Sequence, residues 1–391
     1  MAQNDLTFYE FFAGGGMARA GLGEAWTCTF ANDFSATKAA AYRKNWGDGD
    51  FILGDIAKVS TEQLPGRASL AWASFPCQDL SLAGAYAGLG AHGADVITRS
   101  GTFWHFWSLI KGMKREGRAP RTIVLENVYG ALTSRGGADF AAIGAALANG
   151  GYWFGAVVID AALFVPQSRP RVFFVATLTY RTLPRHLTTP IATEWHPGAL
   201  TRAQAHLRGL AQERWVWWNL PPVPTRTTQL GDLVEEAPAD VAWHSDAETA
   251  RLLSMMSEGN RKKVETASQA AQRVVGTIYR RTRPDEDGVK HQRAEVRFDG
   301  VAGCLRTPGG GSSRQTIMVV EGKKVRSRLL SAREAARLMG LPDTYILPGR
   351  YNEAYHLAGD GVCVDVVRFL AKSLLEPLST GSATCMTIAA E

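Results

Sequence analysis

Two side chains in the first third of the chain have the types and positions of a nucleophile and a proton donor. Cys77 comes just after a predicted strand (residues 70–75), and Pro76 fixes the turn between them. A thiol at a strand end can act as an exposed nucleophile, although a lone cysteine is more often buried and inert. Glu126 ends the next predicted strand (residues 122–126). Its carboxyl could give a proton or a hydrogen bond to a ring nitrogen, or it could be an exposed charge.

Two arginines precede a later predicted strand over residues 172–177. Because side chains alternate along a strand, Arg169 and Arg171 are expected to share one face. Two guanidiniums on one face suit a carboxylate, a phosphate or a carbonyl oxygen, and the alternative is a solvated edge strand. Cys77 and Glu126 lie at the ends of two predicted strands, so we expect them at one edge of a sheet.

A glycine-rich turn follows the first predicted strand. The string FAGGGM, from Phe12 to Met17, allows a tight turn and a close approach of a ligand to the backbone. Asp33 closes the second predicted strand, 19 residues after Gly14, where a carboxylate can accept hydrogen bonds from ribose hydroxyls. Phe12 suggests a contact with an adenine ring, and Asp55 could bind its amino group. The alternatives are a turn without a ligand and, for Asp55, a plain turn residue.

These residues need a scaffold, and the pattern from residue 7 to about 178 predicts an α/β sheet with helices on both faces. The predicted strands are Thr7–Phe12, Thr27–Ala31, Leu70–Phe75, Thr122–Glu126, Ala156–Asp160 and Val172–Thr177, and the predicted helices are Met17–Glu24, Ala36–Asn45, Thr102–Lys114 and Ala138–Asn149. Further on, Ser331 and Glu334 form a capping-box pattern that opens a helix, and a last helix is expected over residues 362–375.

Composition excludes several classes of protein. The 391 residues are 46% hydrophobic and 20% charged, which suits two or three folded domains. No run of 18 apolar residues and no secretion signal is present, so we expect a cytoplasmic protein without a membrane span. Five scattered cysteines indicate neither disulfides nor a metal site.

The net charge of +6 is unevenly placed. Residues 261–330 hold 16 Lys and Arg against 7 Asp and Glu, while the rest of the chain holds 27 against 30. A basic segment on a near-neutral body suggests either a bound polyanion or a solvated loop.

The order of the short strings is more specific than any one of them. FAGGGM, PCQ (76–78), ENV (126–128) and QSRPR (167–171) follow one another, and RSGTF (99–103), RLLSARE (328–334), MGLPDTY (339–345) and GDGV (359–362) are further matches. In this order and spacing the chain closely resembles the DNA cytosine-5 methyltransferases over nearly its full length.

The resemblance implies a Rossmann-like mixed sheet that binds S-adenosylmethionine (SAM, with S-adenosylhomocysteine, SAH, as product), and a smaller irregular target-recognition domain. Cys77 then corresponds to the nucleophile that attacks C6 of cytosine, and Glu126 to the group that holds N3 and the exocyclic amine. Arg169 would support the base's carbonyl and the carboxylate, and Arg171 would steady the loop. The implied cofactor-binding residues are Phe12, Ala13, Gly14, Gly15, Gly16, Met17, Asp33, Phe34, Asp55, Ile56, Phe75, Thr102, Asp360 and Val362.

The same resemblance divides the chain by function. Residues 1–189 would form the catalytic domain, residues 190–327 the target-recognition domain, and residues 328–391 a segment that completes the catalytic domain. A glycine-rich lid is expected over residues 79–101. Candidate DNA contacts are Gln78, Ser81, Arg99, Arg280, Arg281, Arg283, Arg306 and Arg314.

The implied partner is double-stranded DNA, with a cognate restriction endonuclease as a candidate second partner. We expect a monomer that associates with the nucleoid. Three alternatives stay open: a tRNA cytosine-5 methyltransferase, a catalytically silent DNA-binding relative, and a dinucleotide oxidoreductase. Each lacks support here. The Cys-Phe-Thr string usual in the tRNA enzymes and the G-x-G-x-x-G turn are absent, and Cys77, Glu126 and Arg169 are all present.

Overall fold

The computed structural model describes residues 6–76, 101–284, 288–306 and 314–380. The chain divides by its contacts into a first unit, Met1–Asp160, Pro170–Val223 and Val362–Glu391, and a second unit, Ala161–Arg169 and Pro224–Gly361. Residues 190–223 thus go with the first unit and residues 328–361 with the second. The functional division at residues 189/190 and 327/328 stays a prediction, because it concerns DNA binding rather than contacts.

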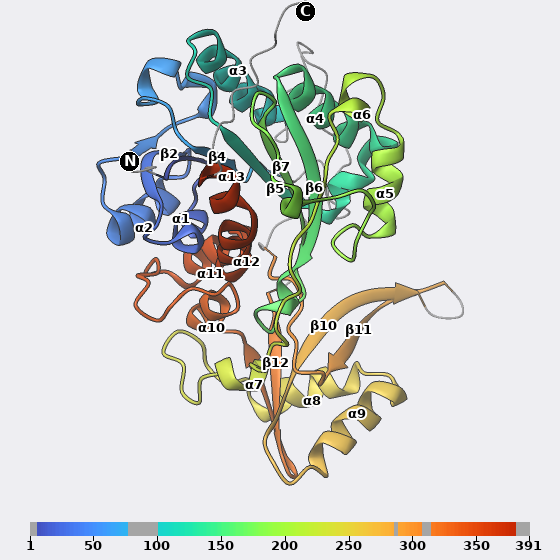
Figure 1. Cartoon of the computed structure of the whole chain (residues 1–391). Helices are drawn as coiled ribbons and strands as arrows, with labels where there is room; N and C mark the ends of the chain where they lie inside the picture. Colours follow the sequence, from blue (N-terminus) through green and yellow to red (C-terminus); the bar gives the residue numbers. More distant parts are fainter. Residues whose placement is uncertain (1–5, 77–100, 285–287, 307–313, 381–391) are drawn as a thin grey trace, which may run out of the picture. The chain divides into compact units, whose positions relative to one another are not determined.

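The first unit is built on a seven-stranded sheet in the order β3-β2-β1-β4-β5-β7-β6 (Figure 1). The strands are β1 (Thr7–Phe11), β2 (Thr27–Asp33), β3 (Phe51–Leu53), β4 (Leu70–Ala73), β5 (Thr122–Val128), β6 (Tyr152–Asp160) and β7 (Pro170–Leu178). From β3 to β5 all neighbours are parallel, whereas β7 runs antiparallel to both β5 and β6. The predicted mixed α/β sheet is confirmed.

Helices cover both faces of this sheet. One face packs its alternate residues, such as Phe11, Leu125 and Phe174, against α3 (Thr102–Arg115), α4 (Ala138–Asn149) and α5 (Gly198–Ala205). On the other face lies α1 (Met17–Leu22), which packs on α12 (Val364–Leu370). A Cβ on Gly21 would lie 2.4 Å from the Val367 Cβ, so only glycine allows these two helices to approach so closely.

The remaining elements of the first unit are α2 (Ala36–Trp46), β8 (Thr188–Thr189), α6 (Leu210–Glu213), β9 (Trp217–Trp218) and α13 (Glu376–Thr380), with short 3-10 turns and one π-helical turn at Ala371–Leu375. Two predicted helix ends need correction. Helix α1 stops at Leu22 because Gly23 takes a positive φ of 74°. The predicted helix over residues 362–375 starts at Val364 and continues into the π-helical turn.

The second unit holds a four-stranded antiparallel sheet in the order β11-β10-β12-β13, where only a basic segment within an irregular domain had been predicted. Its strands are β10 (Val274–Pro284), β11 (Lys290–Arg297), β12 (Thr316–Glu321) and β13 (Lys324–Leu329). Its helices are α7 (Leu230–Leu233), α8 (Asp246–Ser254), α9 (Glu258–Ser268), α10 (Ala332–Arg337) and α11 (Tyr351–Asp360). Ile278, Val296 and Met318 form a small core with residues of α8 and α9.

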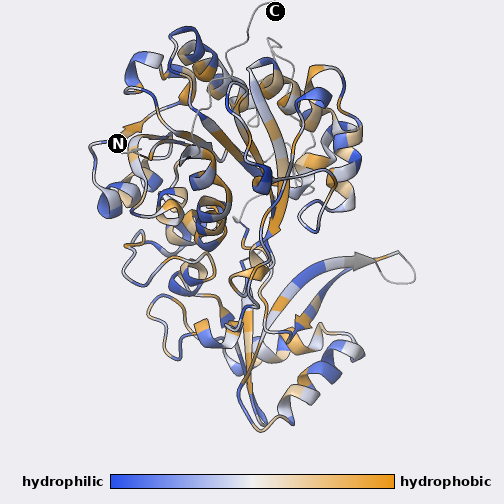
Figure 2. Cartoon of the chain, in the orientation of Figure 1, coloured by the Kyte–Doolittle hydropathy of each residue, from blue (hydrophilic) through white to orange (hydrophobic). Residues whose placement is uncertain are grey.

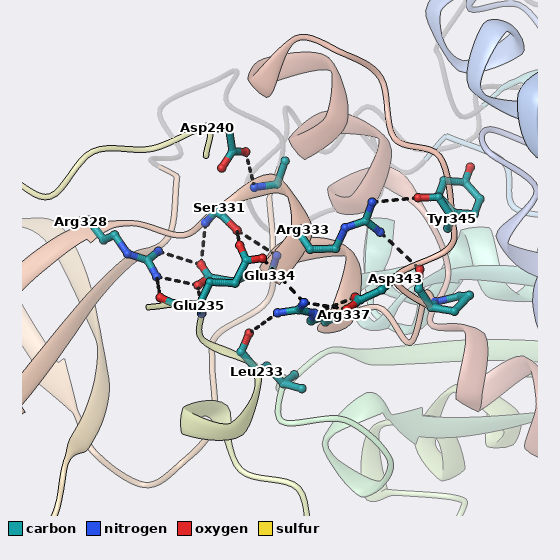
Figure 3. Close-up of polar contacts among 12 residues, drawn as sticks. Leu233, Glu235, Asp240, Arg328, Ser331, Arg333, Glu334, Arg337, Asp343 and Tyr345 are labelled. Atoms are coloured by element: carbon teal, nitrogen blue, oxygen red, sulfur yellow. Dashed lines mark hydrogen bonds and ion pairs between the residues drawn. The ribbon is translucent and has the colours of Figure 1, made fainter. Parts of the chain in front are cut away.

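A buried ion pair holds the start of α10 (Figure 3). The Arg328 guanidinium donates to both carboxylate oxygens of Glu334, at 2.8 and 2.6 Å, and both side chains are fully buried. Ser331 and Glu334 also form the predicted capping box. Arg328 and Ser331 further bind Glu235, so the segment before α8 is joined to the same cluster.

We expect Glu334→Ala to cost about 3–5 kcal/mol of unfolding free energy, because it leaves the Arg328 guanidinium buried without its carboxylate. Urea unfolding measures this loss. The matched control is Glu258→Ala, which removes an exposed ion pair with Lys262 on α9 and should cost less than about 1 kcal/mol. Equal losses in the two variants would contradict the assigned role of the buried pair.

Candidate active site

The ends of the parallel strands bring most of the predicted catalytic-domain residues to one edge of the sheet. The glycine turn follows β1, Asp33 ends β2, and Phe75 lies just after β4. Glu126 lies two residues before the end of β5. Ligands of open α/β sheets bind at this carboxyl edge, so it is the candidate site of the first unit.

Glu126 is paired with Arg171. The Arg171 Nε lies 3.2 Å from Glu126 Oε1, and both side chains are mostly buried, at 14% and 9% exposure. The sheet register explains the pairing, because Arg171 lies opposite Val128 and Phe173 lies opposite Glu126. Strand β7 runs antiparallel, so its first residues lie beside the last residues of β5. The guanidinium therefore fixes one carboxylate oxygen of a nearly buried acid.

Asn127 ties the end of β5 to the segment that leads to Cys77. Its Nδ2 donates to the Phe75 carbonyl at 3.2 Å, and its Oδ1 accepts from the Val128 N–H at 2.8 Å. The Phe75 ring packs on Phe103 of α3, with ring centroids 5.5 Å apart. Asn127 stands inside the ENV string but was not predicted as a site residue. Its amide fixes the path of the backbone just before the predicted nucleophile.

Arg169 differs from the expectation. Strand β7 begins at Pro170, so Arg169 lies just before the strand that carries Arg171, and the two guanidiniums have different partners. Within the second unit, its buried guanidinium donates to the carbonyls of Leu305 at 3.1 Å, Gly359 at 2.8 Å and Gly361 at 2.7 Å. It thus holds the GDGV segment, and Arg171 makes the contact with Glu126 that the sequence analysis had given to Arg169.

Asp33 shapes the glycine turn. Its Oδ2 accepts from the Gly14 N–H at 2.9 Å, and its Oδ1 accepts from the Ser35 N–H at 2.8 Å. Phe12, just before the glycines, has a φ of 56°, which is unusual for a residue with a side chain. Such strain often marks a ligand site. A carboxylate has about four acceptor positions, so Asp33 can still accept from a sugar hydroxyl.

The indole of Trp46, on α2, contacts the glycine turn. Its Nε1 donates to the Gly15 carbonyl at 3.0 Å. A Cβ on Gly16, whose φ is 78°, would lie 2.3 Å from that same nitrogen. Gly16 therefore has to be glycine for both its backbone angle and its space. Trp46 was not predicted as a site residue, because its sequence position gives no sign that it reaches the turn.

Two apolar side chains at strand ends are exposed: Phe34 directly follows β2, and Leu53 is the last residue of β3. The Phe34 side chain is 72% exposed and Leu53 is 42% exposed. Asp55 is exposed, and its Oδ1 accepts from the Ala57 N–H at 3.0 Å. An exposed aromatic ring beside carboxylates and a glycine turn fits the adenosine part of a nucleoside cofactor. The residues of this edge therefore fit the implied cofactor.

Of the other predicted cofactor residues, five have buried side chains and two lie at the ends of helices. Ala13, Met17, Ile56, Phe75 and Val362 have buried side chains. Thr102 begins α3 and is half-buried. Asp360 ends α11, is exposed, and belongs to the second unit.

Cys77, Gln78, Ser81 and Arg99, and the predicted lid, lie outside the described residues. Arg280, Arg281 and Arg283 lie on β10, and the first two are exposed, as is Arg306. The Arg314 guanidinium lies 5.5 Å from the centre of the Tyr351 ring.

None of the described helices has the length and apolar character needed to cross a membrane.

Comparisons with known proteins agree with this geometry. The sequence profile of the C-5 cytosine-specific DNA methylases matches residues 6–376. The chain is 26% identical to the type II methyltransferase M.NlaX of Neisseria lactamica, over 95% of this chain and 97% of that protein. It is 23% identical to M.HhaI of Haemophilus parahaemolyticus, over 94% of each chain.

Solved structures share the fold. The Entamoeba histolytica methyltransferase EhMeth aligns with a TM-score of 0.59 at 14% identity, covering 96% of this chain and 99% of that one. The S. pombe Dnmt2 methyltransferase aligns with a TM-score of 0.56 at 17% identity, covering 95% and 99%. With the profile match across nearly the whole sequence, these findings show that the chain belongs to the C-5 cytosine-specific DNA methylase family.

Proposed function

We propose that this protein transfers a methyl group from SAM to C5 of a cytosine that is flipped out of a specific duplex DNA sequence. The observation that carries the proposal is the Glu126–Arg171 pair, a nearly buried acid at the carboxyl edge of the sheet. Asn127 joins this acid to the segment that precedes Cys77. In a chain of this family, this arrangement supports Glu126 and Cys77 as the acid and the nucleophile of one site.

Cytosine C5 is a poor nucleophile, so the ring must first be activated. The Cys77 thiolate adds to C6, and the Glu126 carboxyl protonates or hydrogen-bonds N3, which moves electron density to C5. SAM, when bound, supplies an electrophilic methyl group on a sulfonium. After C5 is methylated, loss of the C5 proton and departure of the thiolate restore the aromatic ring. Arg171 keeps the Glu126 carboxyl in place throughout.

The glycine turn, Asp33, Phe34 and Asp55 would hold the cofactor. Asp33 would accept from the ribose, Phe34 would pack on the adenine, and Asp55 would bind its amino group. The target base must leave the helix, because neither face of its C5–C6 bond is accessible in a stacked duplex.

The β10–β11 ribbon is the proposed DNA-contacting element of the second unit. Residues 279–284 and 290–297 contain six basic residues and one acidic residue. Exposed Arg281 lies directly opposite exposed Arg293 in the register. Like charges placed opposite each other destabilise a sheet. Glu295, whose Oε2 lies 3.4 Å from the Arg281 Nε, offsets part of this repulsion, and phosphates would offset the rest. A two-stranded ribbon also fits the major groove, and Figure 2 shows hydrophilic stretches on both strands.

The type II names of the relatives favour a restriction-modification setting. We therefore propose a cognate restriction endonuclease as a functional partner, and a monomer that works at the nucleoid.

Cys77→Ser should abolish methyl transfer, because an alcohol is a far weaker nucleophile than a thiolate. Tritiated methyl transfer to mixed-sequence duplex DNA measures the loss. With 5-fluorocytosine in the substrate, the wild type should form a covalent adduct visible by denaturing electrophoresis, because fluorine cannot leave as a proton does. Transfer by the serine variant at the wild-type rate would remove Cys77 as the nucleophile.

Arg171→Leu should lower the rate of methyl transfer by about 10²–10³-fold, because the Glu126 carboxyl loses the partner that orients it. The matched control is Arg115→Leu, which removes an exposed arginine at the end of α3. Single-turnover rates at saturating DNA separate this effect from binding. A rate like that of the control would contradict the role given to Arg171.

The double variant Arg281→Ala/Arg293→Ala should bind duplex DNA more weakly and with a smaller salt dependence. Two lost phosphate contacts reduce the slope of log Kd against log salt by about 1.8. The control is Arg261→Ala/Lys262→Ala, which removes the same charge from exposed positions on α9. Titration of labelled duplex at several salt concentrations gives both slopes, and an unchanged slope in the ribbon variant would exclude this surface.

A further inference from the structure

Glu10 is a carboxyl group in the middle of the sheet that the proposed reaction does not use. It lies on β1, between Ala31 of β2 and Trp72 of β4 in the register, and is 1% exposed. A buried carboxyl is costly unless its position gives it hydrogen-bond partners. It stands four residues before Gly14, in the strand that feeds the glycine turn.

The partners of Glu10 are the first backbone N–H groups of α1. Its Oε1 accepts from the Arg19 N–H at 3.3 Å, and the Ala18 backbone also lowers the pKa of the carboxyl. These are the third and second residues of the helix, whose N–H groups have no partner inside it. Gly16 offers no capping side chain, and the first turn of α1 holds no acidic residue. Glu10 therefore caps α1 from the neighbouring strand.

Three contacts thus define the path of the turn. Asp33 binds the Gly14 N–H, Trp46 binds the Gly15 carbonyl, and Glu10 binds the start of α1. The second oxygen of Glu10, Oε2, is buried and has no hydrogen-bond partner among the described residues. An ionised carboxylate is poorly stabilised when one of its oxygens is buried without a hydrogen bond. A protonated carboxyl in the same place loses much less free energy.

The charged and titratable groups around Glu10 come from three sides. Arg19 of α1 favours the ionised form, and Asp33 of β2 disfavours it. Burial is the largest influence and raises the pKa of Glu10 to about 8. Cys28 of β2 and Tyr42 of α2 face the same cluster, and burial raises the pKa of each, so both are neutral. The Arg19 guanidinium is already engaged by the Tyr42 hydroxyl at 2.8 Å and by Asp50 at 3.6 Å.

We propose that Glu10 is a positioning residue of the cofactor site that acts as a neutral acid, holding the glycine turn against α1, and that its ionisation weakens cofactor binding. Ionised Glu10 would draw the Arg19 guanidinium toward itself. That guanidinium lies over the rings of Tyr42 and Trp46, at 5.7 and 5.2 Å from their centres. Moving it disturbs Trp46, which holds Gly15. The inference rests on the proposed use of SAM.

Calorimetric titration with SAH from pH 6 to pH 9.5 tests the proposal. SAH carries no sulfonium, so a direct attraction to an ionised Glu10 does not mask the effect. Wild-type affinity should fall above pH 8 by up to about tenfold per pH unit. Glu10→Gln, a neutral isostere, should bind SAH at pH 7 to within about threefold of the wild type and lose this extra fall. Its profile also corrects for titration of the ligand's amino group. Glu10→Ala should bind more weakly at every pH.

Thermal unfolding without ligand gives a second readout. Between pH 4.5 and about pH 8, Glu10 is protonated in the folded chain but ionised in the unfolded chain. The contribution of Glu10 to the free energy of unfolding therefore falls as the pH rises. The melting temperature of Glu10→Gln minus that of the wild type should therefore rise from pH 5 to pH 8 and then level off.

The outcomes separate this inference from the proposed function. Wild-type protein that binds no SAH at pH 7 would remove the proposed cofactor. SAH binding with identical pH profiles in the wild type and Glu10→Gln would overturn the role of Glu10 alone. Failure of Glu10→Gln to fold or to bind at pH 7 would also overturn it, because the ionised form would then be the required one.

Discussion

The antiparallel direction of one strand, β7, brings to the acid of this site the side chain that holds it. If β7 were parallel to β5, its first residues would lie at the opposite edge of the sheet and Arg171 could not reach Glu126. Because β7 is antiparallel, the register sets Arg171 opposite Val128, and the guanidinium lies 3.2 Å from the carboxylate. The pair is nearly buried, so the carboxyl has little freedom to turn toward solvent. The proposed chemistry at N3 of cytosine depends on this fixed orientation.

The cofactor edge is organised in the same way, by side chains that reach a loop from neighbouring elements. Asp33, Trp46 and Glu10 come from β2, α2 and β1, and each contacts a different part of the path from Gly14 to the start of α1. The glycines leave the backbone accessible, while the three side chains restrict its conformation. Exposed Phe34 directly follows Asp33, and its ring is the proposed contact for an adenine.

Much of the fold could be predicted from the sequence because apolar periodicity and glycine positions are local signals. The strand that carries Glu126 and the capping box at Ser331 are confirmed. The antiparallel sheet of the second unit was missed, because its basic strands have exposed polar residues that hide the alternation. The partner of Glu126 depends on the antiparallel register of β7 against β5, which local sequence patterns do not reveal. The contacts made by Trp46 and Glu10 join different elements of the fold and have no sequence signal of their own.

The most direct test of the central claim is bisulfite sequencing of a plasmid from cells that express the protein, compared with cells that express Glu126→Ala. The wild type should protect cytosines in one sequence context from conversion, and the variant should protect none. Protection of the same cytosines by the variant would contradict the claim that this carboxyl activates the base.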